Sequence, residues 1–118
     1  MDTLIIGNQP EPDIRRRIVA AWNSGKAEPA ARLDFVNLDD AWKVLSPKRR
    51  AIMSVMAGAG PLTIREIARR AHRDVRAVHS DVHTLLRSGV IDKTDDDRMI
   101  LPYKVVKFDF MLDSQRAA

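Results

Sequence analysis

The chain has no cysteine, which excludes a disulfide scaffold, a thiolate metal site and a cysteine nucleophile. Aromatic residues make up only 5% of it, so base stacking on single-stranded nucleic acid is not indicated. No stretch approaches the roughly 18 consecutive apolar residues of a membrane helix, and the first residues lack the basic, apolar pattern of a secretion signal. At 118 residues, the sequence predicts one cytoplasmic domain with no membrane partner.

Negative charge is scarce in the middle of the chain. Residues 46–94 hold ten Lys and Arg against four Asp and Glu, whereas the whole chain has a net charge of +4. Arginine supplies 14 of the 20 cations, and its planar fork suits phosphate and guanine better than the lysine ammonium does. The middle of the chain therefore has the charge expected of a polyanion-binding surface.

The N-terminal third mixes short strands with one helix. Residues 3–7 predict a strand that ends at Gly7, and residues 14–22 predict a helix with Arg15, Arg16 and Arg17 on its solvent side. Residues 26–32 have the small and polar composition of a linker, and residues 33–36 predict a second short strand.

Two helices with clear start signals follow. Asn37 is the expected N-cap of a helix over residues 38–45, and Ser46 with Pro47 is expected to begin a helix over residues 47–57. The positions expected to face inward are Leu38, Ala41, Trp42 and Leu45 in the first helix and Ile52, Val55 and Met56 in the second. Trp22, Trp42 and Phe35 are expected in the core rather than in a ligand pocket.

The next stretch is the most informative. Thr63 and Glu66 have the spacing of a capping box, which predicts a helix over residues 64–71, and residues 74–88 predict a longer helix that Gly89 ends. The apolar stripe of the longer helix comprises Val75, Val78, Val82, Leu85 and Leu86. Residues 90–94 and 98–101 predict a hairpin, so the order is helix, helix, helix, hairpin.

Residues 104–112 alternate in the manner of a half-buried strand, with Val106, Phe108, Phe110 and Leu112 on one face. A lone strand is not stable, so we expect this one to extend a sheet with the N-terminal strand of the same chain or with a second subunit.

Four segments resemble the winged helix-turn-helix transcriptional regulators of the MarR and ArsR types: residues 45–50, 60–68, 75–82 and 85–91. The resemblance spans residues 45–102 and implies an α+β, mainly helical fold, a winged helix-turn-helix with an added N-terminal strand and helix and a C-terminal strand. More narrowly, the chain is similar to small predicted regulators that often act as the antitoxin of a toxin–antitoxin pair. That likeness implies the alternative function, an antitoxin that neutralises a co-encoded toxin and represses its own operon.

Helical geometry separates two sides of residues 74–88. At 100° per residue the apolar stripe lies on one side, whereas Arg76, Ser80 and Arg87 lie on the other, free to enter a major groove. The residues expected to read bases are Arg73, Arg76, Ala77 and Ser80. Those expected to contact DNA phosphates are Lys48, Arg49, Arg50, Thr63, Arg65, Arg69, Arg70, His83, Arg87, Lys93 and Arg98.

Other chemistry is not indicated. His79, Ser80 and Asp81 are consecutive on a helix and cannot converge as a catalytic triad. His79 and His83 share a helix side, but a third metal ligand at suitable spacing is missing, so they are interpreted as polar or DNA-facing. Three acids at residues 95–97 disfavour insertion of the hairpin tip into the minor groove. We therefore expect no enzyme activity, cofactor or metal.

These observations predict a transcriptional regulator that binds double-stranded DNA. We expect it to act as a repressor. Residues 37–103 are expected to form the DNA-binding domain, residues 1–36 a strand–helix extension and residues 104–118 a final strand with a frayed tail. A homodimer is expected, since paired recognition helices read palindromic half-sites. The two terminal segments, 1–36 and 104–112, are its expected dimerisation surface.

Overall fold

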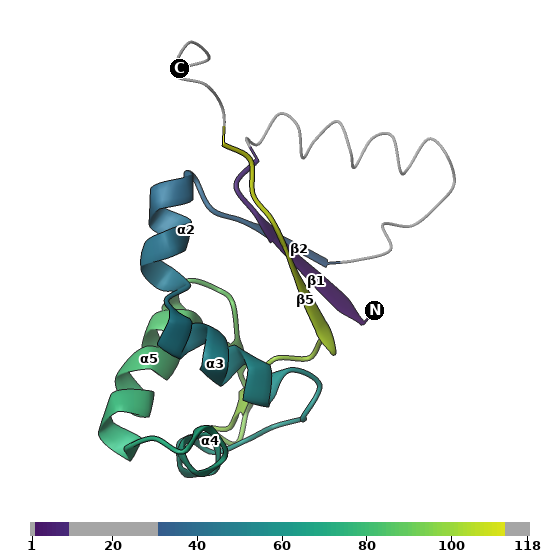
Figure 1. The fold of residues 1–118 in the computed structure, drawn as a ribbon. Coiled ribbons are helices and arrows are strands. Elements are labelled where there is room, and N and C mark those ends of the chain that lie inside the picture. Colours follow the sequence, from purple (N-terminus) through teal and green to yellow (C-terminus); the bar gives the residue numbers. More distant parts are fainter. Residues whose placement is uncertain (1, 10–30, 113–118) are drawn as a thin grey trace.

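The computed structural model describes residues 2–9 and 31–112, which form an α+β fold (Figure 1). Its helices are α2 (Leu38–Val44), α3 (Pro47–Met56), α4 (Ile64–Ala71) and α5 (Val75–Arg87). Its strands are β1 (Thr3–Gly7), β2 (Ala31–Asp34), β3 (Asp92–Lys93), β4 (Met99–Ile100) and β5 (Val105–Asp109). The predicted helix over residues 14–22 lies outside the described residues.

The helices begin where the capping signals predict. The Asn37 side chain accepts a hydrogen bond from the Asp40 amide at 2.8 Å, and Ser46 does the same for the Arg49 amide at 3.3 Å. Pro47 occupies the first turn of α3, where no backbone donor is needed. Local side-chain chemistry therefore fixes these two helix starts.

The link between α4 and α5 is a tight turn. His72 ends α4 in the left-handed region with φ of 55°, and the Asp74 carboxylate accepts the Arg76 amide at 3.1 Å to begin α5. Gly89 follows α5 with φ of +84°, and a β-carbon there would make only an ordinary contact of 3.7 Å with Leu33 Cδ1, so backbone conformation rather than crowding favours glycine. A short turn with a defined backbone conformation therefore joins the two helices.

The larger sheet joins the two ends of the described chain. All its strands are parallel, in the order β2–β1–β5, with Ile6 opposite Leu33 on one side and Phe108 on the other. The expectation that the last strand would pair with the N-terminal strand of the same chain is confirmed. The second predicted strand is displaced: Ala31 and Arg32 belong to β2 rather than to a linker, because their backbone pairs with β1.

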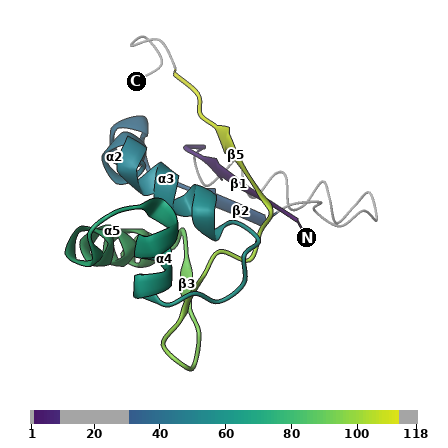
Figure 2. The ribbon, with the colours of Figure 1, turned by 60° about the horizontal axis from the view of Figure 1, so that its bottom comes forward.

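The smaller sheet is the predicted hairpin. Lys93 pairs with Met99 in an antiparallel ladder, and the Thr94 amide donates to the Arg98 carbonyl at 2.7 Å across the turn. Leu62 and Met99 exchange two backbone hydrogen bonds of 2.8 Å, which attach the hairpin to the segment before α4. Figure 2 shows the hairpin projecting from the side of the helices away from the larger sheet.

One hydrophobic core connects the larger sheet to the helices. Leu4 and Ile6 of β1 belong to the same buried cluster as Ile52 of α3 and Leu85 of α5. Since β1 and β5 are paired, the two ends of the described chain contribute to one sheet that shares this core.

Two inward-facing predictions need correction. Val75 is 43% exposed because it lies in the first turn of α5, beyond the reach of the core, and Trp42 is 52% exposed, packing edge-on against Phe110 at 5.2 Å. Val55 is half-buried and packs against the core, and Met53, which was not predicted to face inward, is buried on the sheet side of α3. Among the described residues, no helix is long and apolar enough to cross a membrane.

Candidate nucleic-acid interface

Helix α5 has one buried side and one exposed side. Val78, Val82 and Leu85 are fully buried and attach the helix to the core. The opposite side exposes the polar or cationic residues Arg76, Ser80 and Arg87 and the small Ala77. The buried and exposed sides of α5 are those that a spacing of 100° per residue predicts. The predicted outer face of this helix is therefore exposed to solvent.

Arg73, which was also predicted to contact bases, forms an ion pair inside the fold. Its Nη1 lies 2.9 Å from Oδ2 of Asp81, while Nε of Arg49 lies 3.1 Å from Oδ1 of the same carboxylate. The three side chains are 19%, 22% and 14% exposed for Arg73, Arg49 and Asp81, so water screens these ion pairs only partly. This Asp81 cluster ties α3, the α4–α5 turn and α5 together.

This structural role of Asp81 was not predicted from the sequence. The signal was present, because Asp81 lies on the helical wheel at the border of the apolar stripe, between Leu85 and Ala77. An acid at the border of a buried stripe in a basic stretch indicates an internal ion-pair partner.

Arg49 and Arg50 also complete the end of α2. The Arg49 Nη1 donates to the carbonyls of Lys43 and Val44, and Arg50 donates to the carbonyl of Leu45. The last carbonyls of a helix lack partners inside the helix and carry partial negative charge, which cationic donors stabilise. Both residues were predicted as phosphate contacts, and both use donors inside the fold.

Thr63 has a capping role at the start of α4. Its side chain accepts the Glu66 amide at 3.1 Å, and the Glu66 carboxylate accepts the Thr63 amide at 3.4 Å. Hydrogen bonds from the backbone and side chain of Thr63 lower the pKa of Glu66. This reciprocal pair confirms the predicted capping box.

The remaining cations of the helices are exposed. Lys48 on α3 and Arg65, Arg69 and Arg70 on α4 are solvent-exposed, and none forms an ion pair with another described residue. Arg76 likewise has no acidic partner in the described ranges. These exposed cations lie on α3, α4 and α5, and no acid of the described residues forms an ion pair with them.

In the β3–β4 hairpin, the acids of the turn pair with the cations on either side of it. Lys93 pairs with Asp97 at 3.0 Å, and Arg98 lies 3.5 Å from Asp96. A hydrogen bond from the Thr94 hydroxyl lowers the pKa of Asp96. The predicted phosphate contacts Lys93 and Arg98 are thus partly neutralised by the acidic turn.

Two histidines lie beside the cations of α5. The rings of His79 and His83 are 4.3 Å apart, and desolvation, followed by the positive charges of His79, Arg87 and Lys93, lowers the pKa of His83. Like charges therefore gather around His83. No group of three potential metal ligands occurs in the described part of the chain.

Residues 44–108 match the family model HVO_A0114, which covers the chain from the end of α2 into β5. The match includes more than half of the sequence, so the chain belongs to the HVO_A0114 family. No curated protein matches the chain.

Proposed function

We propose that the protein is a sequence-specific regulator, in its simplest form a repressor, that binds double-stranded DNA through a winged helix-turn-helix unit. In this proposal α3, α4 and α5 are the three helices of the unit, and the β3–β4 hairpin is its wing. The observation that carries the proposal is the outer face of α5, which is exposed along its length while its other side is fixed in the core.

The proposed recognition helix is α5. A major groove is roughly 12 Å wide and admits one α-helix, whose first turns reach the base edges. Arg76, Ala77 and Ser80 occupy these turns and are exposed. Arginine can donate two hydrogen bonds to guanine, so Arg76 is the principal proposed base contact.

Phosphate contacts are assigned to the cations that the fold leaves free. Lys48 lies on α3 and Arg65, Arg69 and Arg70 lie on α4, the two helices that contact α5, and Arg87 lies on the outer face of α5. Such contacts supply affinity and register without sequence information. Arg49, Arg50 and Arg73 are assigned a positioning role instead, since Arg49 and Arg50 donate to Asp81 or to backbone carbonyls and Arg73 forms an ion pair with Asp81.

The proposed wing contacts the DNA backbone through its sides rather than through its tip. Lys93 and Arg98 flank the turn, while Asp95, Asp96 and Asp97 occupy its end. Three carboxylates at the tip would be repelled by the phosphates on either side of a minor groove.

Fluorescence anisotropy tests this proposal with a duplex from the upstream region of the gene and a scrambled duplex, over a range of salt. We expect selective binding whose log affinity falls linearly with log salt. Arg76→Ala should weaken binding to the upstream duplex, whereas Lys43→Ala, an exposed cation on α2, should not. Equal weak binding to both duplexes, or an Arg76→Ala protein that binds like the wild type, would contradict the proposal.

A second candidate function is binding of a partner protein, as an antitoxin binds its toxin. The observation that favours it is the exposure of apolar side chains just after the carboxyl ends of β2 and β5, where Val36 is 91% exposed and Leu112 is 87% exposed. Where such side chains form one contiguous patch, the patch is typical of an interaction surface. Co-purification of a toxin encoded next to this gene, lost in a Val36→Asp and Leu112→Asp double variant, is the expected result for this function.

A further inference from the structure

In residues 2–9 and 31–112, no strand pairs with the outer edge of β5. The larger sheet ends at this strand, and no other described strand lies beside it. The Val105 amide donates to the Asp2 carbonyl of the β1 segment at 3.0 Å, so in a parallel ladder Val105, Lys107 and Asp109 point their backbone groups toward β1. The amides and carbonyls of Val106 and Phe108 consequently point away from the sheet, toward this open edge.

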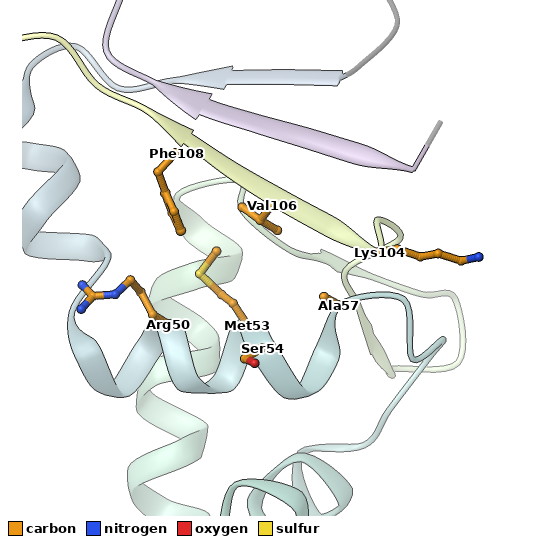
Figure 3. A pocket seen from close by; sticks show the side chains of 7 residues that line it. All are labelled: Arg50, Met53, Ser54, Ala57, Lys104, Val106 and Phe108. Atoms are coloured by element: carbon orange, nitrogen blue, oxygen red, sulfur yellow. The ribbon is translucent and has the colours of Figure 1, made fainter.

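Apolar side chains accompany these unpaired backbone groups. Val105 is 53% exposed and Phe108 is 41% exposed. Figure 3 shows Val106 and Phe108 extending from β5 toward α3, where they line a groove of about 290 Å³ together with Met53 and Ala57. An open edge with apolar side chains is a template for another strand.

The charges on β5 specify which strand fits. If two copies of β5 pair antiparallel about a two-fold axis at Phe108, Lys107 of one copy lies opposite Asp109 of the other, and the reverse pair forms as well. An axis at Lys107 or at Asp109 would instead place identical charges opposite each other. Only the register centred on Phe108 brings opposite charges together, and Phe108 is also a residue whose backbone groups face the open edge.

The side chains of this register are available for pairing. Lys107 is exposed and forms no ion pair with any described residue, and the Asp109 side chain is 41% exposed with only a distant contact of 3.8 Å to Arg32. The other edge strand differs. Arg32 and Asp34 of β2 pair with each other at 2.9 Å and are 13% and 8% exposed, so their charges are satisfied within one copy.

We infer that the β5 edge binds a second copy of this chain, in an antiparallel pairing centred on Phe108 that joins two three-stranded sheets into one. Each Phe108 backbone donates to and accepts from the partner's Phe108, and Val106 pairs with the partner's Phe110. The two Phe108 rings lie side by side on the helix face, beside the α3 groove, while the Lys107–Asp109 pairs lie on the opposite face. The inference does not depend on DNA binding, and a dimer that binds no DNA would leave it intact.

Sedimentation velocity on the full chain, with charge reversals, tests the inference. The wild type should sediment as a dimer at micromolar concentrations. Lys107→Asp places carboxylates opposite each other at both pairs and should weaken dimerisation about tenfold or more. The double variant Lys107→Asp with Asp109→Lys restores opposite charges in this register alone, so it should recover the dimer. Lys104→Asp, a charge reversal just before the strand, is the matched control and should remain dimeric.

Amide hydrogen exchange provides a second readout that folding defects do not imitate. The amides of Val106 and Phe108 should become protected as protein concentration rises, whereas those of Lys107 and Asp109, which point toward β1, should be protected at every concentration. Circular dichroism of each variant verifies that the monomer is folded. A wild type that stays monomeric, a dimer insensitive to Lys107→Asp, or a double variant that does not recover would each overturn the inference.

Discussion

Arg73 in the α4–α5 turn and Arg76 in the first turn of α5 are three positions apart, yet their environments are opposite. Arg73 is held against Asp81 and is 19% exposed, whereas Arg76 is exposed and has no acidic partner among the described residues. The inner arginines Arg49 and Arg73 stabilise the helical unit, and the outer ones are available to a polyanion. The net charge of a basic stretch therefore overstates the positive charge that is exposed to a partner, because ion pairs inside the fold use part of that charge.

The largest expected effect comes from removing the acid that holds the inner arginines. Asp81→Ala leaves Arg49 and Arg73 without their partner in a partly buried position, so the free energy of unfolding should fall by about 3 kcal/mol. Urea denaturation measures this change. Asp92→Ala, which removes an exposed acid from β3, is the matched control and should change stability little. Equal stability of the two variants would show that the Asp81 ion pairs contribute no more than surface pairs do.

Arginine substitutions at the two positions should separate stability from binding. Arg76→Ala should lower affinity for the specific duplex by about 10-fold to 100-fold with an unchanged melting temperature. Arg73→Ala should lower the melting temperature and affect affinity less. Anisotropy and differential scanning calorimetry on the same preparations measure both quantities. The reverse pattern would exchange the roles assigned to the two residues.

Thr63→Ala removes the cap of α4 and should cost about 1 kcal/mol of stability. The lowered pKa of Glu66 gives this cost a pH dependence. A depressed carboxyl pKa contributes stability above its ordinary value of 4.5 and loses it as the pH falls through the folded-state pKa. The difference between the wild type and Thr63→Ala in urea denaturation should therefore shrink in acid. A Thr63→Ser variant, which retains the hydroxyl, should keep most of the stability.

The smallest expected effect concerns His83. Desolvation and neighbouring cations lower its pKa below 6.5 in the free protein, and a nearby phosphate would raise it again. The complex would then hold more protons than the free protein, so affinity should increase as the pH falls from about 7.5 to about 5.5. His83→Gln should reduce this increase by about threefold, while His72→Asn, outside α5, should not. An unchanged pH profile in His83→Gln would contradict the sequence-based prediction that His83 contacts a DNA phosphate.

The sequence was sufficient for elements whose signals are local. Asn37, Ser46, Thr63 and Asp74 each accept a backbone amide two or three residues ahead, and the helices begin directly after them. The hairpin was equally accessible, although its paired strands are shorter than predicted. A cap is decided within four residues, so no knowledge of the rest of the fold is required.

Features that depend on distant partners were harder to predict. The exposure of Val75 and Trp42 depends on where the core ends, and the displacement of β2 depends on its register with β1. In the candidate site, the outer side of α5 followed from helical geometry, but the capture of Arg73 and Arg49 by Asp81 spans three elements. Helical periodicity identifies the side of a helix and contains no information about ion pairs between elements.

The central place of β1 in its sheet has a consequence for biosynthesis. During translation β1 emerges from the ribosome before β5, and the two strands are neighbours in the finished sheet. The contacts among α3, α4, α5 and the hairpin need only the middle of the chain. This unit can therefore fold before β5 is available to pair with β1. Leu4 and Ile6 then stay without their β5 neighbours until translation reaches residues 105–109. A chain interrupted before that point would display an apolar strand, which is a signal for chaperones and proteases.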